Sequence, residues 1–150
     1  MKDFMKEAIK QAQIALKNEE VPIGAVIVKD SKIIAKGRNS REKSQNAINH
    51  AEIIAISKAC KKLKSWRLDD CDIYVTLEPC PMCAGAISNA RIRKLIYACP
   101  EKTGEDSLCP AILKSKRLNH RVLIEIDLRY QEECSSMLTN FFKNKRKKDD

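Results

Sequence analysis

The 150-residue sequence lacks the features of a membrane-spanning or secreted protein. No apolar run approaches the ~20 residues that cross a bilayer, and the longest one, residues 21–28, has the length of a strand. The N-terminal segment carries Asp3 and Glu7 and no long apolar stretch, so it does not resemble a signal peptide. We therefore expect a protein that works in the cytoplasm and has no membrane partner.

Histidine is scarce, and the cysteines do not suit a disulfide framework. Only His50 and His120 are present, so few histidine-containing sites are possible. The seven cysteines are an odd number in a chain without a secretory signal, which disfavours structural disulfides. Cys80 and Cys83 are the only pair with the spacing of metal ligands, so this pair is the candidate metal motif among the cysteines.

The chain also lacks internal repeats and any Gly-, Pro- or Ser-rich linker that would divide it. Apolar residues make up 43% of the sequence, which is enough for a core, and 150 residues would be short for two independent cores. We therefore expect residues 1–150 to form a single domain, with residues 143–150 as a basic, low-complexity C-terminal tail.

Acidic residues are too few to balance the basic ones. The chain has 29 Lys and Arg against 20 Asp and Glu, a net charge of +9. The tail holds five basic and two acidic residues, so it carries +3 and leaves +6 on the body. A basic body with a basic tail suits a polyanionic partner, and nucleic acid is the first candidate. The alternative is an ordinary soluble protein with a high isoelectric point, and charge alone does not separate the two.

Hydrophobic periodicity predicts a mixed order of helices and strands. Helices are expected over residues 3–17, 50–63, 81–90 and 131–143, and strands over residues 22–28, 33–37, 72–77, 94–98 and 122–126. Residues 38–49 and 99–110 hold no period and are expected to be irregular. The first two strands read as a hairpin. The alternating units that follow imply an α/β protein whose mixed sheet has helices on both faces.

Three helices carry specific burial predictions. In the first, one apolar face at helical spacing consists of Phe4, Ala8, Ala12, Ala15 and Leu16. In the second, the isoleucines of residues 53–56 contribute to a wide apolar surface, which predicts a heavily buried helix. In the last, the adjacent Phe141 and Phe142 cannot both face one side, so we expect one to be buried and the other exposed.

The pair Cys80 and Cys83 is the first chemical motif. Two cysteines three residues apart can bind one metal ion when they lie at the start of a helix. Pro81 suits the first turn of such a helix. The positive end of the helix dipole favours the thiolate form that binds metal. A lone C-x-x-C is also compatible with a buried cysteine pair, a redox motif or half of a closed zinc site.

His50 adds a third candidate ligand. Alone, a histidine at a helix start is more often a cap or a surface residue. Together with Cys80 and Cys83 it leaves one tetrahedral position open, which indicates catalysis through a metal-bound water. Cys99 or Cys109 as a fourth ligand would instead close the site. The mixed set of imidazole and thiolates favours zinc.

Glu52 lies two residues from His50 and is placed to move protons. H-x-E combined with P-C-x-x-C is the described signature of the zinc deaminases, and the sequence matches it. In that chemistry a carboxyl group that does not bind the metal takes a proton from water and delivers it to the ring nitrogen and the departing amine. The alternative is a solvated glutamate on a helix surface.

Further strings resemble the bacterial family of tRNA-specific adenosine deaminases over nearly the whole chain. They are E-V-P-I-G-A-V at 20–26, G-R-N at 37–39, H-A-E-I at 50–53, S-W-R-L at 65–68, Y-V-T-L-E-P-C at 74–80, M-C-A-G-A at 82–86, R-I at 91–92, L-N-H-R at 118–121 and F-F-K at 141–143. Many deaminases share the zinc signature, whereas V-P-I-G-A and T-L-E-P-C-x-M-C-A-G-A are more particular to this family.

This resemblance implies a fold and an activity. The fold is the three-layer α/β/α cytidine-deaminase-like type with a five-stranded mixed sheet. The activity is conversion of adenosine to inosine at wobble position 34 of a tRNA anticodon, with tRNA-Arg(ACG) as the expected substrate. The family implies one zinc ion per subunit and a homodimer.

The resemblance also assigns substrate-binding residues. Asn39 matches the position that hydrogen-bonds the flipped purine, and the backbone around Leu77 and Glu78 lines the same pocket. The residues that match a C-terminal helix contacting the anticodon stem-loop are Phe142, Lys143, Lys145 and Arg146.

The chain departs from the family pattern in two places. A-I-N at 47–49, which puts Asn49 beside His50, stands where P-T-A usually precedes the histidine, and the loop 99–108 is shorter and keeps only Gly104. Two other functions stay open. One is a free nucleobase or nucleoside deaminase acting on guanine, cytosine or cytidine, which the basic tail and T-L-E-P-C disfavour. The other is a non-catalytic, zinc-stabilised RNA-binding subunit, which the presence of Glu52 disfavours.

Overall fold

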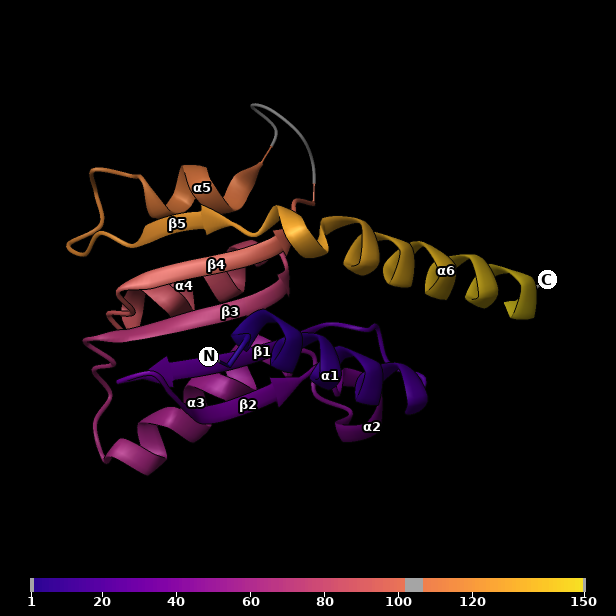
Figure 1. The fold of residues 1–150 in the computed structure, drawn as a ribbon, viewed down its shortest axis with the longest axis horizontal. Coiled ribbons are helices and arrows are strands. Elements are labelled where there is room, and N and C mark those ends of the chain that lie inside the picture. Colours follow the sequence, from indigo (N-terminus) through magenta and orange to yellow (C-terminus); the bar gives the residue numbers. More distant parts are fainter. Residues whose placement is uncertain (1, 102–106, 150) are drawn as a thin grey trace.

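One five-stranded sheet organises the computed structural model, which describes residues 2–101 and 107–149 (Figure 1). The strands are β1 (Gly24–Lys29), β2 (Lys32–Arg38), β3 (Cys71–Leu77), β4 (Lys94–Cys99) and β5 (Leu123–Ile126), in the order β2-β1-β3-β4-β5. Strand β1 is antiparallel to β2 and β3, whereas β3, β4 and β5 are parallel to one another. The mixed sheet and its opening hairpin are therefore confirmed.

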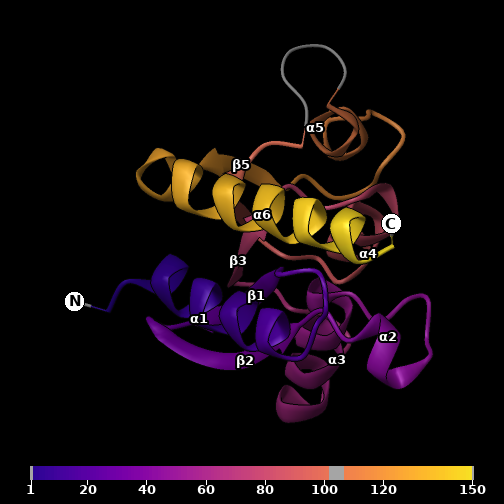
Figure 2. The same cartoon turned by 90° about the vertical axis from the view of Figure 1, so that its right-hand side faces the viewer.

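Helices cover both faces of this sheet. They are α1 (Phe4–Lys17), α2 (Arg41–Ser44), α3 (Ala51–Leu63), α4 (Pro81–Asn89), α5 (Leu108–Leu113) and α6 (Gln131–Asp149), with a 3₁₀ turn η2 (Leu128–Tyr130) before α6. One buried cluster joins the sheet to α3, α4 and α5. A second joins its other face to α1 and α6 (Figure 2). The three-layer α/β/α fold is therefore confirmed.

Close backbone approaches fix the helices against the hairpin. Asp30 and Ser31 turn the chain between β1 and β2 with φ values of 51° and 62°, the left-handed conformation that a tight hairpin turn needs. A Cβ at Gly37 would lie 2.2 Å from the carbonyl oxygen of Ala51, so only glycine allows α3 to begin against β2. This contact sets the position of His50, the residue before Ala51.

Two short helices occupy segments that the sequence indicated as irregular. Helix α2 lies inside residues 38–49, and α5 begins inside residues 99–110. Helices of four and six residues are too short to show a helical period, which explains the wrong prediction. Residues 102–106, with Gly104 and half of the expected loop 99–108, lie outside the described residues.

The C-terminal helix is longer than expected. Helix α6 continues past Lys143 to Asp149, so the basic segment forms its last turns rather than a separate tail. In Figure 1 this helix extends beyond the edge of the sheet. Within the described ranges, no helix is both long and apolar enough to cross a bilayer.

Two of the burial predictions are wrong in part. In α1, Ala8, Ala12 and Ala15 are buried as expected, but Leu16 is 39% exposed, and Met5 and Ile9 are buried in addition. Helix α3 turns its alanines to the sheet and leaves the isoleucines of 53–56 only half-buried. The close approach at Gly37 explains this arrangement, because a helix that lies so near a strand accommodates only small side chains at the contact.

Candidate active site

Three side chains from two helix starts meet where β3 ends. His50 is the N-cap residue of α3, Cys80 is the N-cap residue of α4, and Cys83 lies in the first turn of α4. Nδ1 of His50 is 3.6 Å from Sγ of Cys80 and 3.6 Å from Sγ of Cys83. All three donor atoms lie within 4.8 Å of one another, so the fold brings together the residues that the sequence singled out as metal ligands.

This donor set fits a tetrahedral zinc ion with one open position. Zinc bonds of ~2.0–2.3 Å at tetrahedral angles place two ligand atoms roughly 3.5 Å apart. The distance from Nδ1 of His50 to each sulfur, 3.6 Å, is close to this value. Among the residues that the structure describes, no fourth His, Cys, Asp or Glu joins the group. The closed site that Cys99 or Cys109 would have completed is therefore not formed.

The two thiols have opposite pKa shifts. The hydrogen bond from Cys83 is the largest cause that lowers the pKa of Cys80; together with the smaller effect of His50 it outweighs partial burial and brings this pKa to about 5. The same hydrogen bond and burial raise the pKa of Cys83. A thiolate at Cys80 is the form that binds metal, and its place at the start of α4 favours it.

Glu52 lies in the first turn of α3 and is only 4% exposed. Burial is the main cause that raises the pKa of its carboxyl group to about 7. A carboxyl group with a pKa near neutrality can both accept and release a proton at that pH. The alternative of a solvated surface glutamate is therefore wrong.

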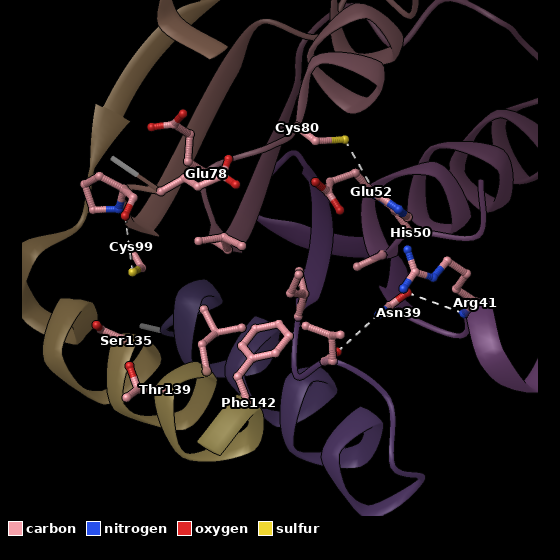
Figure 3. A pocket seen from close by; sticks show the side chains of 17 residues that line it. Asn39, Arg41, His50, Glu52, Glu78, Cys80, Cys99, Ser135, Thr139 and Phe142 are labelled. Atoms are coloured by element: carbon pink, nitrogen blue, oxygen red, sulfur yellow. Dashed lines mark hydrogen bonds between the residues drawn. The ribbon is translucent and has the colours of Figure 1, made fainter. Parts of the chain in front are cut away.

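A cavity of about 520 Å³ joins these groups to the solvent (Figure 3). His50, Glu52 and Cys80 line one part of it. Asn39 and Arg41 form a second side, and the ends of β3 and β4 form a third. The remaining wall is the face of α6 that carries Ser135, Leu138, Thr139 and Phe142. The cavity is large enough for a small organic group such as a nucleobase.

Four of the expected substrate-binding residues line this cavity: Asn39, Leu77, Glu78 and Phe142. Lys143, Lys145 and Arg146 do not line it but follow Phe142 along α6, with exposed side chains. Phe142 is 43% exposed, whereas Phe141 is half-buried and packs edge-on against it at 5.3 Å between ring centroids. Of the expected pair of one buried and one exposed ring, Phe142 is the exposed one, whereas Phe141 is only half-buried.

Sequence reasoning missed part of the cavity wall. Arg41 extends from α2 toward Asn39 and His50 in Figure 3, and Ser135 and Thr139 face the cavity one turn apart on α6. The one available signal was the four-residue spacing of the two hydroxyls, which does not show what the helix packs against.

Glu78 is 3% exposed, and its Oε1 atom has no hydrogen-bond partner among the described residues.

A cytidine-deaminase-like sheet that presents a histidine, two cysteines and a buried glutamate at one cavity defines a deaminase of the metal-dependent class. Comparison with known proteins agrees, since residues 1–146 match the family model of the MafB19-like deaminases. The tRNA-specific adenosine deaminase of Bacillus subtilis (strain 168) is 46% identical over 146 residues, which are 97% of this chain and 90% of the relative. The chain belongs to the tRNA-specific adenosine deaminase family.

Solved structures give the same result. One, from work on A-to-I editing by tRNA:A34 deaminases at the wobble position of transfer RNA, has a TM-score of 0.82 and 38% identity, and the match covers 90% of this chain and 98% of that chain. Guanine deaminase from Bacillus subtilis also has 38% identity, but its TM-score is 0.62 and the match covers 70% of this chain and 79% of that chain. The fold thus agrees over more of its length with the tRNA deaminase.

Proposed function

We propose that this protein is a zinc-dependent hydrolase that converts adenosine to inosine at the wobble position of a tRNA anticodon. The observation that carries the proposal is the buried Glu52 beside a three-residue ligand group with an open fourth position. The names of the relatives supply the substrate class. Residues 1–150 act in this proposal as one deaminase domain.

His50, Cys80 and Cys83 would hold the zinc ion. Bound there, zinc would lower the pKa of a water molecule so that hydroxide is available near neutral pH. Glu52 takes one proton of that water and delivers it to the purine ring nitrogen, then takes the second proton and delivers it to the departing amine. Water and adenosine become inosine, which keeps the first proton on its ring nitrogen, and ammonia, which carries the second, so Glu52 ends in the protonation state in which it began.

Asn39 and the β3 end orient the base. The Asn39 amide already has local partners, since its Nδ2 donates to the Val21 carbonyl oxygen and its Oδ1 accepts from the Arg41 amide, each at 3.4 Å. These long bonds hold the side chain at the cavity while leaving it able to bond a purine. The backbone at Leu77 and Glu78 forms the facing wall. A base within RNA can reach such a cavity only when it is unpaired and splayed out, which suits an anticodon loop.

The end of α6 supplies the contact with the rest of the RNA. Phe142 presents an exposed ring at the cavity, and aromatic rings of this kind stack on unpaired bases. Lys143, Lys145 and Arg146 follow it with exposed cationic side chains, which suit the phosphates of the anticodon stem-loop. This geometry favours RNA over the neutral alternatives, free guanine, cytosine or cytidine.

The protein acts as a homodimer in this proposal. Gly85 lies inside α4, where glycine costs about 1 kcal/mol relative to alanine, yet an added Cβ would meet nothing within 4 Å. The fold of one chain therefore gives no reason for a glycine there, whereas the close approach of a second chain would. Met82 on α4 is 38% exposed, and Ile53 on the adjacent α3 is half-buried, so apolar surface accompanies the glycine.

The test is to incubate zinc-loaded protein with an anticodon stem-loop that carries adenosine at the wobble position, and in parallel with free guanine, cytosine and cytidine. We expect inosine in the RNA and no turnover of the free compounds. Turnover of guanine without inosine would favour the activity of the related guanine deaminase. Tight RNA binding without any turnover would favour a non-catalytic RNA-binding subunit.

A further inference from the structure

Glu20 is a buried carboxylate that the proposed reaction does not use. It lies between the end of α1 and the start of β1 and is only 2% exposed. No Lys or Arg forms an ion pair with it in the described part of the chain. Its two oxygens instead accept hydrogen bonds from two backbone amides, Glu42 N–H at 3.0 Å and Lys43 N–H at 2.8 Å.

These two amides lie in the first turn of α2. A helix normally satisfies them with the side chain of its own N-cap residue. Here the N-cap residue is Ser40, and it makes no such bond. Glu20 therefore caps α2 from a position more than 20 residues earlier in the chain. A carboxylate that accepts hydrogen bonds from two amides makes charge-assisted bonds, which are stronger than those of a serine hydroxyl.

The segment that Glu20 caps forms one wall of the cavity. Asn39 and Arg41, which flank Ser40, both line it. Residues 20–23, the lead-in to β1, make two further hydrogen bonds to this segment. Asn39 N–H donates to the Ile23 carbonyl at 3.1 Å, and Asn39 Nδ2 donates to the Val21 carbonyl. The lead-in 20–23 and the wall 39–43 therefore form one connected unit.

The other end of this wall adjoins His50. Ser40 N–H donates to the carbonyl of Asn49 at 3.1 Å, and the Asn49 amide group donates to the Ser44 hydroxyl at 2.8 Å. Most side chains of residues 41–48 are exposed, so few apolar contacts hold this segment in place. Its position consequently depends on polar contacts. Among these, the two hydrogen bonds from Glu42 and Lys43 are accepted by the buried carboxyl group of Glu20.

We propose that Glu20 is a positioning residue for the deamination, acting through Asn39: by capping α2 it fixes the wall that presents the Asn39 amide to the substrate base. This inference rests on the proposed function. It does not place Glu20 in contact with the substrate. Without the carboxylate, the amides of α2 lose their partners, the turn loosens, and the Asn39 amide no longer has one orientation at the cavity.

A double-mutant cycle tests this role. The variants are Glu20→Ala, Asn39→Ala and both together, with Glu19→Gln as a control because that neighbouring carboxylate is 83% exposed. We expect Glu20→Ala to lower kcat/KM for the stem-loop on the order of 10–100-fold, the range for a displaced positioning group. The zinc content should stay at that of the wild type. In the Asn39→Ala background, the same change should cost less than about threefold.

Three results would overturn the proposal: Glu20→Ala within about threefold of the wild type, losses at Glu20 and Asn39 that multiply, or an equal loss in the Glu19 control. If Glu20→Ala does not fold, Glu20→Gln replaces it in the cycle, since it keeps the size and one acceptor oxygen. Hydrogen exchange gives a second readout, with faster exchange of the Glu42 and Lys43 amides and unchanged exchange in α3.

Failure of the proposed function is recognised separately. A wild-type protein that forms no inosine counts against the deamination of tRNA, whatever the variants do. In that case the exchange of the Glu42 and Lys43 amides alone decides whether Glu20 fixes this wall.

Discussion

Nδ1 of His50 lies 3.6 Å from Sγ of Cys80, although the two residues are 30 positions apart in the chain. Each is the N-cap residue of its helix, and the two helices pack against each other beneath the sheet. The contact therefore depends on the packing of α3 and α4 and not on a flexible loop. A metal ion bound by these two helix starts would be held rigidly, which is what a catalytic metal requires.

Removal of zinc should abolish activity. We expect about one zinc ion per chain in the wild type and a loss of bound zinc and activity in Cys83→Ala, because a thiolate ligand is gone. Cys60→Ala is the matched control, since Cys60 lies outside the ligand group. Zinc affinity should fall as the pH falls, because His50 and both cysteines must lose protons to bind metal. Metal analysis after dialysis measures this, and full zinc retention by Cys83→Ala would contradict the ligand set.

Loss of the Glu52 carboxyl group should separate metal binding from catalysis. Glu52→Gln keeps the size of the side chain but cannot take up a proton, so turnover should fall by at least about 10²–10⁴-fold. Zinc content should match the wild type because Glu52 is not in the ligand group. Glu132→Gln, at an exposed position of α6, serves as the control. Single-turnover inosine formation is the measurement, and a Glu52→Gln variant with wild-type rate would remove Glu52 from the mechanism.

The end of α6 should determine how strongly RNA binds. Replacing Lys145 and Arg146 with alanine should weaken binding of the anticodon stem-loop at low salt. The slope of log K against log salt should become shallower by roughly 1 for each lost phosphate contact. Lys36→Ala, an exposed cation on β2, should leave the slope unchanged. Equal slopes in all variants would show that RNA does not contact this part of α6.

Gly85 should report on the association of two chains. Gly85→Glu places a charged side chain on α4 where one chain leaves open space, so the monomer should fold normally. If a partner packs there, the variant should sediment as a monomer while the wild type sediments as a dimer. Gly85→Ala is the smaller change and gains about 1 kcal/mol of helix propensity. Dimers of undiminished affinity in Gly85→Glu would move the interface to another surface.

Asp3 should make folding stability depend on acidity. Partial burial alone would raise the pKa of Asp3, but hydrogen bonds from Tyr130 and the Lys6 amide and the charge of Arg129 together hold it below its ordinary value of 3.8. Because the folded pKa is the lower one, the stabilisation is present above pH 3.8 and is lost as the pH falls through the folded value. Asp3→Asn should cost about 1 kcal/mol at neutral pH. Urea unfolding should show this difference disappearing in acid, and a constant difference would contradict it.

The sequence predicted the ligand group and Glu52 because their signals are local. The H-A-E and P-C-P-M-C strings each lie at a helix start, and each carries its chemistry within a few residues. The strands could be predicted equally well, since β3 and β4 are short apolar runs bounded by polar residues. The sequence predicted the hairpin and the mixed sheet, but it did not predict the strand order β2-β1-β3-β4-β5.

Other parts of the cavity wall could not be predicted, because they depend on contacts between distant segments. The two hydrogen bonds that Glu20 accepts from amides of α2 join residues 22 and 23 positions apart, and nothing in either segment alone indicates them. Likewise, Ser135 and Thr139 reach the cavity only because α6 packs across the ends of the strands. The isoleucines of α3 were assigned to the core because periodicity shows an apolar face but not how close the sheet approaches.

The most direct test is the position of inosine in a complete tRNA. Zinc-loaded wild-type protein, with Glu52→Ala as the control, is incubated with a tRNA-Arg transcript bearing an ACG anticodon, and the product is sequenced for A-to-I conversion. The proposed function predicts conversion at the wobble adenosine alone, and none with Glu52→Ala. Wild-type protein with its full zinc content that leaves that adenosine unchanged would contradict the central claim.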